Sequence, residues 1–177
     1  MSDFDTLCRE AGTDPRAALA LREAFLRRGC VMAVMLPGLR HRLEGSALVG
    51  PIALAALVDA AREVGLDAHR HGDTVWAAGQ ASSVTGLLDL LAVEIPGHLH
   101  PAAAVGFGEV IVGPKADLHG GEVENVRALI RYAREGEVLC TPAASTLEAP
   151  DGVGRFAAPK AVAEAVGMSV EVWRDYR

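Results

Sequence analysis

The sequence is poor in aromatic residues, in lysine and in long apolar runs, and each shortage narrows what the chain can be. Aromatic side chains make up 5% of the 177 residues, so the core must be mainly aliphatic. Lysine occurs only at Lys115 and Lys160, and the formal net charge is −6. Because no basic segment can neutralise a series of phosphates, we expect no nucleic-acid partner. The lack of any uninterrupted apolar run of about 18 residues argues against a membrane span or a membrane partner.

Cysteine is also scarce, and its placement excludes two common uses. Cys8, Cys30 and Cys140 are odd in number, far apart, and lack a Cys-x-x-Cys pair. This pattern argues against a disulfide framework and a cysteine-based zinc site, so we expect reduced thiols. The N-terminus opens acidic, with Met-Ser-Asp-Phe-Asp, where a secretory signal would open basic; we therefore expect a cytoplasmic protein. The length suits one domain of ordinary size.

Apolar periodicity and turn residues predict alternating helices and strands. Helices are expected at 13–28, 46–64, 82–91, 121–134 and 160–166. Strands are expected at 30–36, 66–70, 74–79, 137–141 and 169–177, and 101–114 is predicted to form two strand segments of a hairpin bent at Gly106-Phe107-Gly108. This order predicts an α+β fold, a ferredoxin-like sandwich whose mostly antiparallel sheet has helices packed on it.

Several short segments, in the same order along the chain, resemble the class III nucleotidyl (adenylate/guanylate) cyclase homology domain. The matching segments are CVMAVMLPGL (30–39), HGDTVWA (71–77), AVGFGEV (104–110), DLHGGEVE (117–124) and REGEVL (134–139). The resemblance covers roughly Cys30 to Arg177. It implies that residues 1–28 form an N-terminal helical extension and that residues 29–177 form a cyclase homology domain of the class III type.

The family's chemistry can be compared with this sequence position by position. Cyclisation needs two carboxylates on adjacent strands to hold two divalent ions, and an Asn and an Arg to orient the ribose and stabilise the transition state. In the register of the resemblance the second metal carboxylate is Asp73, whereas the first position holds Met35, a non-ligating thioether. Glu124 stands at the Asn position and Ala128 at the Arg position, so most of the constellation is missing.

A second register does not restore that constellation. Sliding by one residue places Asn125 at the Asn position, but Leu129 then occupies the Arg position and the Gly136-Glu137 match fails without a deletion. The position that selects the base falls near His69 in either register. The resemblance therefore implies a pseudoenzyme that acts as a dimerising regulatory or protein-interaction module in bacterial signalling, as a homodimer or as a heterodimer with another signalling domain.

Two other functions stay open at this stage. The domain can bind a nucleotide without turnover, through Asp73, Asp117, Arg127 and Arg131, and act as a sensor. It can also be a divergent, weakly active adenylate/guanylate cyclase that uses Asp73 with Glu124 as a substitute carboxylate. No cofactor is expected, and Mg²⁺ or Mn²⁺ would bind only together with a nucleotide.

Two further groups of residues have plainer interpretations. Arg127, Arg131 and Arg134 form a basic stripe on the predicted helix that could contact a phosphate, although a solvated helix face explains the same spacing. The pairs His69/His71 and His98/His100 could each contribute to a metal site. Without a third ligand at suitable spacing, exposed strand-edge or loop histidines are the simpler interpretation.

Overall fold

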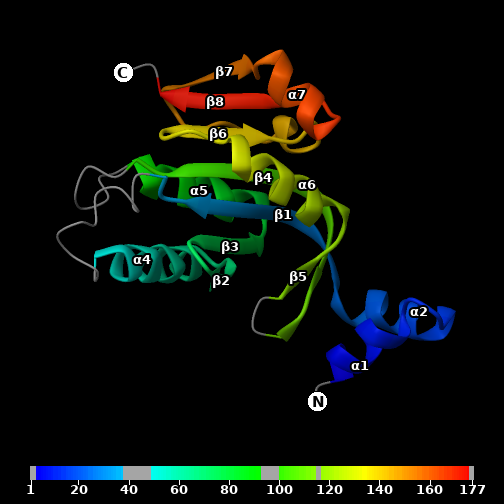
Figure 1. Cartoon of the computed structure of the whole chain (residues 1–177). Coiled ribbons are helices and arrows are strands. Elements are labelled where there is room, and N and C mark those ends of the chain that lie inside the picture. Colours follow the sequence, from blue (N-terminus) through cyan, green and yellow to red (C-terminus); the bar gives the residue numbers. More distant parts are fainter. Residues whose placement is uncertain (1–2, 38–48, 93–99, 115–116, 176–177) are drawn as a thin grey trace.

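One mixed sheet organises the chain in the computed structural model, which describes residues 3–37, 49–92, 100–114 and 117–175. Within these residues the sheet has eight strands, in the order β2-β3-β1-β4-β6-β8-β7, and β5 pairs with β4 (Figure 1). The strands are β1 (Leu26–Met35), β2 (Asp67–His71), β3 (Thr74–Gly79), β4 (Ala102–Val112), β5 (Leu118–His119), β6 (Glu137–Cys140), β7 (Val153–Ala157) and β8 (Glu171–Asp175). All neighbouring pairs are antiparallel except β4 and β6, which run parallel.

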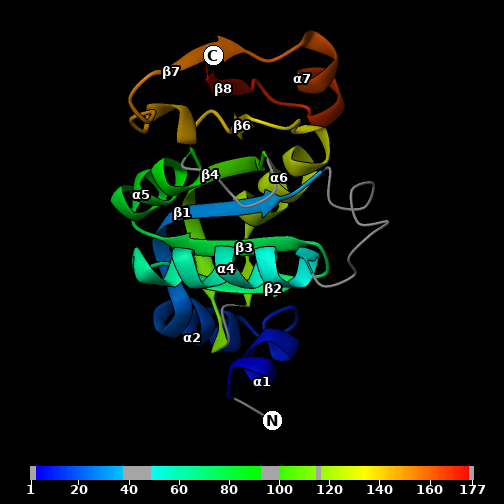
Figure 2. The ribbon, with the colours of Figure 1, turned by 90° about the vertical axis from the view of Figure 1, so that its left-hand side faces the viewer.

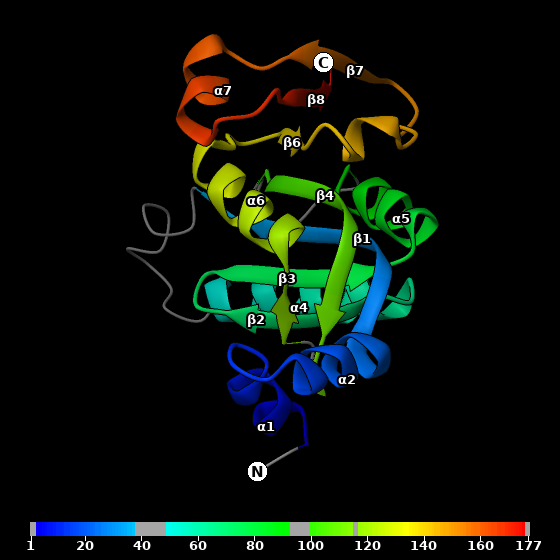
Figure 3. The ribbon, with the colours of Figure 1, turned by 90° about the vertical axis from the view of Figure 1, so that its right-hand side faces the viewer.

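Helices lie on both faces of this sheet, and the two N-terminal helices lie against the end where β1 and β4 extend past β3. They are α1 (Asp3–Glu10), α2 (Pro15–Phe25), α4 (Val49–Glu63), α5 (Ala81–Ala92), α6 (Gly121–Leu129) and α7 (Lys160–Val166), with short 3₁₀ turns η3 (Ile130–Tyr132) and η4 (Ala144–Thr146). Helix α4 packs on β2 and β3, and α5 packs on β1, which places both on one face (Figure 2). Helix α6 packs on β4 and β1 from the opposite face (Figure 3).

The central strand β1 separates two apolar cores. Its even-numbered residues, such as Met32 and Val34, are buried in the core beneath α4 and α5. Its odd-numbered residues, Val31 and Ala33, are buried in the core beneath α6. Side chains of a strand alternate between faces, so the unbroken apolar run that predicted a buried strand supplies both cores.

The N-terminal helices cover the part of β1 and β4 that extends past β3. The β1–β3 pairing ends at Cys30, whereas β1 continues to pair with β4 back to Leu26. Helix α2 begins after Asp14, whose carboxylate accepts a hydrogen bond from the Arg16 backbone N–H at 2.8 Å. Phe4 of α1 is 3% exposed and meets the Phe25 ring edge-on at a centroid distance of 4.9 Å. These contacts seat α1 and α2 on the extended end of the sheet.

The α+β fold with a largely antiparallel sheet is as predicted, and the elements differ in detail. Helix 160–166 and strand 74–79 have the predicted bounds, and the helix at 46–64 is described from Val49 onward. The helix predicted through Arg28 ends at Phe25, because the next residues pair with β4. The helix predicted through Arg134 ends at Leu129 and continues only as a 3₁₀ turn to Tyr132. Helix α1 and strands β5 and β7 were not predicted.

The bent hairpin predicted at 101–114 is wrong. Residues Ala102–Val112 form one continuous strand, and β1 pairs with it from Ala102 to Ile111 without interruption. The glycines have another purpose: a Cβ at Gly106 would lie 2.6 Å from Glu122 Oε2 and 2.9 Å from Val126 Cγ2. The glycines therefore mark the close approach of α6 to the strand, which is the alternative meaning of glycine within a strand.

Candidate functional site

The end of β1 and the tip of the β2–β3 hairpin lie side by side. The antiparallel register pairs Met35 with Thr74, and Asp73 directly precedes Thr74 in the turn. Gly72 adopts a left-handed φ of +64° there, which favours glycine and fixes the hairpin tip. The Thr74 hydroxyl donates a hydrogen bond to Asp73 Oδ1 at 3.4 Å. The sheet thus brings the two metal positions of the resemblance onto neighbouring strands.

The chemistry of this pair does not suit a divalent cation such as Mg²⁺. Asp73 offers a carboxylate, but Met35 offers only a thioether and packs against the core beneath α6. Mg²⁺ requires oxygen ligands, whereas thioethers suit soft metals. Among the described residues no cluster of three or more His, Cys, Asp or Glu side chains could hold a metal ion. The donor set at the hairpin tip therefore does not fit the two-ion centre that cyclisation needs.

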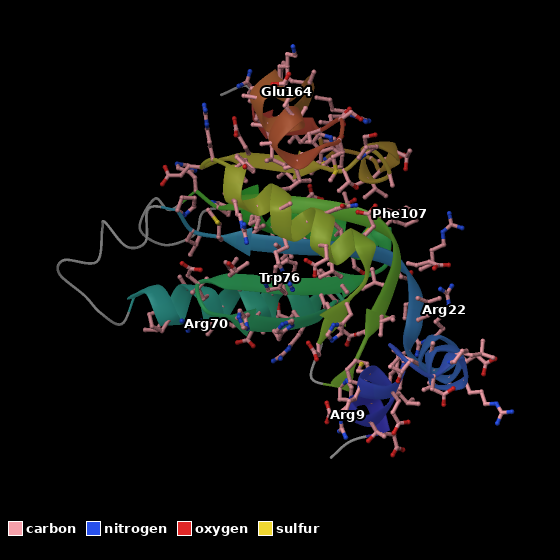
Figure 4. The ribbon with its side chains drawn as sticks, turned by 45° about the vertical axis from the view of Figure 1, so that its right-hand side comes forward. Arg9, Arg22, Arg70, Trp76, Phe107 and Glu164 are labelled. Atoms are coloured by element: carbon pink, nitrogen blue, oxygen red, sulfur yellow. The ribbon has the colours of Figure 1, made fainter. Side chains whose placement is uncertain are left out.

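Trp76 and Arg127 form a stacked pair between β3 and α6. Trp76 points to the side of the sheet where α6 lies and is 7% exposed (Figure 4). The guanidinium carbon of Arg127 lies 5.5 Å from the centroid of its ring, and Arg127 Nη1 also contacts Glu124 Oε1 at 3.1 Å. The cation is therefore shared between an aromatic face and a carboxylate on the same helix. Sequence reasoning named Arg127 but not Trp76, because only the strand register places the ring beneath the helix.

The basic stripe proposed from the sequence is only partly present. Arg127 lies on α6, whereas Arg131 lies in the 3₁₀ turn η3 and Arg134 lies beyond both elements. Arg131 is exposed and forms no hydrogen bond or ion pair within the described parts of the chain. The helix ends too early for the three guanidinium groups to share one helical face.

Asp117 lies close enough to His69 to act on it electrostatically. Asp117 Oδ2 lies 3.1 Å from His119 Nε2, and the Asp117 carbonyl accepts a hydrogen bond from the Gly113 N–H at 2.7 Å. His69 pairs with Trp76 across β2 and β3. Its Nδ1 is buried and has no hydrogen-bond partner among the described residues. Desolvation lowers the pKa of His69, and the charge of Asp117 opposes this shift.

We use the name "α6-side surface" for the group formed by His69, His71, Trp76, Asp117 and Arg127. Figure 3 shows α6 crossing β1 and β4, while β5 stands in front of β2 and β3. The alternation of β2 places His69 and His71 on this side, and Asp117 acts electrostatically on His69 from the segment before β5. Of the four predicted nucleotide-binding residues, the structure brings Asp117 and Arg127 to this surface and places Asp73 at the hairpin tip.

Glu122 is a second residue that the sequence analysis did not single out. Its side chain lies over Gly106 and Gly108 of β4, and its Oε2 is buried without a hydrogen-bond partner in the described residues. The first turn of a helix favours a carboxylate, which offsets part of the desolvation cost. The paired glycines of β4 were the available signal, because they leave room for a side chain from a packed helix.

Cys140 and the pair His98/His100 remain to be located in the structure. Cys140 is buried at the end of β6, and burial raises its thiol pKa far above the usual range, which does not suit a nucleophile. His98 lies outside the described residues, so the pair with His100 stays a prediction. No helix in the described part of the chain combines the length and the apolarity needed to cross a membrane.

Comparison with known proteins gives structural relatives but no relatives by sequence. No family model and no curated protein matches the sequence. The crystal structure of the guanylyl cyclase Cya2 is similar to the chain with a TM-score of 0.59 and 18% identity, over 84% of this chain and 91% of that chain. The adenylyl cyclase CyaB from P. aeruginosa gives a TM-score of 0.59 and 17% identity, over 86% and 97% of the two chains.

A third structure extends the similarity to a nucleotide complex. The guanylate cyclase domain of RhGC from Catenaria anguillulae, crystallised with GTP, matches with a TM-score of 0.62 and 12% identity, over 87% of this chain and all of that chain. Identities this low establish architecture rather than activity. The chain has the α+β fold of class III adenylyl and guanylyl cyclase catalytic domains.

Proposed function

We propose that the protein is a catalytically degenerate class III cyclase-like domain that dimerises and acts as a regulatory or protein-interaction module in bacterial signalling, in the cytoplasm. The observation that carries the proposal is Met35, which lies next to the Asp73 hairpin where the resemblance requires a second carboxylate. One carboxylate and one thioether cannot hold two divalent cations. Without them the attacking and leaving oxygens lack their electrostatic clamp.

The ribose-orienting positions support the same conclusion. Glu124 stands at the position of the family's Asn and is engaged by Arg127 on its own helix. Ala128 stands at the position of the Arg and has no donor to offer. Removing one transition-state donor typically costs about 10²- to 10³-fold in rate, so several such losses leave negligible turnover. The alternative function, a weak cyclase that uses Asp73 with Glu124, would require Glu124 to leave Arg127 for a metal.

Dimerisation would use the α6-side surface. Helix α6 packs on β4 and β1, and on this face of β2 the exposed side chain of His71 is left for another chain. Among the structural relatives, a guanylyl cyclase domain of the RhoGC fusion protein from Blastocladiella emersonii is described as a non-canonical dimer in one crystal structure and as monomeric in another. We expect a homodimer, and a heterodimer with another signalling domain is the other outcome.

A nucleotide sensor without turnover is the second candidate. It is favoured by one observation: Arg127 lies over Trp76 on the same surface that brings Asp117 close enough to act on His69. A guanidinium, an aromatic face and a carboxylate are groups that recognise phosphates and bases. Any Mg²⁺ or Mn²⁺ would then enter with the nucleotide, with Asp73 as the remnant metal ligand.

The test of the proposal is a cyclase assay on the full chain with ATP or GTP and Mg²⁺ or Mn²⁺. We expect no cyclic product from the wild type or from Met35→Asp, because the second variant restores only one missing group. The triple variant Met35→Asp, Glu124→Asn, Ala128→Arg should show more turnover than either if the loss is explained by these positions. Wild-type turnover that disappears in Asp73→Ala would refute the pseudoenzyme, and its loss in Glu124→Ala would favour the substitute-ligand cyclase.

Thermal unfolding with nucleotides separates the two remaining functions. A ligand present at 100 times its dissociation constant stabilises the folded state by about 2.7 kcal/mol. A nucleotide-dependent shift that is lost in Arg127→Gln and Asp117→Asn supports the sensor. No shift with ATP or GTP, with or without Mn²⁺, supports a module that acts through protein contacts alone.

A further inference from the structure

A cavity lies between the N-terminal helices and the end of the sheet opposite the hairpin tip. Its volume is about 630 Å³, and it is widely open to solvent. It is lined by the α2–β1 junction, the C-terminal part of α4, the start of β2 and the end of β4, and we call it the N-terminal cavity. The residues used below are Phe25, Arg27, Arg62, Leu66, Asp67 and Val112. Asp67 begins β2 whereas Asp73 follows its end, so this cavity is separate from the hairpin tip, and it adjoins the α6-side surface, where Arg62 acts electrostatically on His69.

Two arginine side chains in this cavity are held in place by backbone carbonyls. Arg62 donates to the Ala68 carbonyl through Nε at 3.2 Å and Nη2 at 2.9 Å. Arg27 donates to the Leu26 carbonyl at 2.9 Å and to the Ala24 carbonyl at 3.2 Å. A guanidinium group has five N–H donors, so each arginine keeps about three for another acceptor. The groups are positioned before any ligand arrives, which lowers the entropic cost of binding.

These two cations also lack acidic partners. Within the described residues neither Arg27 nor Arg62 forms an ion pair. Elsewhere in the described residues, arginines do pair with carboxylates, for example Arg22 with Glu109, Arg127 with Glu124 and Arg155 with Glu171. Among the described lining residues Asp67 alone is acidic, so these residues carry two cations and one anion, a formal charge of +1, in a chain of net charge −6.

Most of the surface that lines the cavity is polar, and Phe25 and Val112 contribute most of its smaller apolar part. Phe25 and Val112 are half-buried and lie in the lining together with the two guanidinium groups, whereas Leu66 is 3% exposed. Planar guanidinium groups bind carboxylates and phosphates through paired hydrogen bonds, and an apolar wall favours a ligand with a hydrocarbon body. We infer that the N-terminal cavity binds a small organic anion, with its carboxylate or phosphate on Arg27 and Arg62 and its apolar part against Phe25 and Val112. A bound ligand would join α2 and α4 to the sheet.

Isothermal titration calorimetry of the full chain tests this inference with benzoate and phenyl phosphate as probes, and with inorganic phosphate as the probe without an apolar body. All titrations are made at equal ionic strength in sodium chloride. We expect benzoate or phenyl phosphate to bind more tightly than inorganic phosphate. Which of the two binds better distinguishes a carboxylate ligand from a phosphate ligand.

Variants then assign the binding to the cavity. Arg27→Gln should weaken binding by about tenfold or more, because it removes charged hydrogen bonds. Asp67→Asn should strengthen it, because it removes the one negative charge of the lining. Arg70→Gln, on the same strand but outside the cavity, is the matched control and should bind like the wild type (Figure 4). Arg27→Gln is preferred to a change of Arg62, which also supports β2. Absence of binding by all three probes at 10 mM (about the limit of useful affinity), or equal binding by Arg27→Gln and the wild type, overturns the inference.

Discussion

At the scale of single residues, the packing of β1 depends on a glycine. A Cβ at Gly29 would overlap the Gly79 carbonyl oxygen, which belongs to the backbone and cannot rotate away. We expect Gly29→Ala to lower the free energy of unfolding by about 1–3 kcal/mol or more, because strands must separate to admit the methyl group. Urea unfolding measures the change. Gly121→Ala is the control: a Cβ at Gly121 meets no atom within 4 Å, so its stability should equal or slightly exceed that of the wild type.

The pKa of His69 predicts how stability changes with pH. Desolvation lowers this pKa below its ordinary value of 6.5. The charge of Asp117 opposes this shift, whereas the charges of His71 and Arg62 add to it. The unfolded chain therefore takes up a proton at His69 before the folded chain does. The free energy of unfolding should fall as the pH drops from about 7.5 through 6.5 towards the lower pKa of the folded state.

Urea unfolding between pH 7.5 and 5.5 checks the contribution of His69. His69→Gln should lose less stability on acidification than the wild type, because glutamine cannot take up the proton. Asp117→Asn serves as the comparison and should lose more stability on acidification than the wild type, because the charge of Asp117 opposes the lowering of the His69 pKa. An equal slope in the wild type and His69→Gln would contradict the assignment of the pH dependence to His69.

The residues of the candidate site were predictable to different degrees. The sequence resemblance placed Met35 and Asp73 at neighbouring positions, and the Met35–Thr74 pairing agrees with it. Trp76 and Glu122 could not be selected in the same way. Their contacts with Arg127 and with the glycines of β4 depend on strand register and on where α6 crosses the sheet. Such contacts join segments distant in sequence and leave no local pattern.

At the scale of elements, α1 is attached to the sheet mainly through one aromatic side chain. Phe4 contacts the Phe25 ring, lies 5.8 Å from the His119 ring, and occupies the space where Gly113 lacks a Cβ. We expect Phe4→Ala to release α1 while the sheet stays folded, because Phe-to-Ala changes in a core cost about 3–5 kcal/mol and an eight-residue helix is not stable alone. Hydrogen exchange should show lost protection in α1 and unchanged protection in β1 and β4.

A matched change on α2 controls for general effects of shortening a side chain. Leu19 is 57% exposed, so Leu19→Ala should leave the exchange of α1 unchanged. Loss of protection across β1 and β4 in Phe4→Ala would contradict local release. It would show instead that the N-terminal helices are part of the cooperative unit of the sheet.

Elements were predictable where a local signal determined them. Helix 160–166 follows a proline and ends at Gly167, which adopts a left-handed φ of +70°, and its predicted bounds are those observed. The start of β1 could not be predicted, because Leu26–Arg28 continue the helical sequence pattern but pair with β4. Tertiary pairing therefore outweighs local propensity at that boundary. The two-residue strand β5 depends in the same way on pairing with β4.

At the scale of the whole molecule, the two faces of the β2–β3 region differ in how far they are covered, and the less covered face can be tested as a dimer interface. One side is covered by α4, whereas the α6-side surface carries His71 and Arg127 in exposed positions. If this surface holds the second copy proposed above, negative charges placed at His71 and Arg127 should weaken self-association. Ile52 lies on the outer side of α4 and is 64% exposed. A negative charge placed at Ile52 should leave self-association unchanged.

Sedimentation velocity over a concentration series checks this expectation with three proteins. The wild type should dimerise, and the double variant His71→Glu, Arg127→Glu should need at least about tenfold more protein to do so, since identical charges would then face one another across a symmetric contact. Ile52→Glu should match the wild type. Weakening by Ile52→Glu alone would place the interface on α4. A monomeric wild type at all concentrations would contradict the homodimer, and a heterodimer with another signalling domain would then be the remaining form of the proposed dimer.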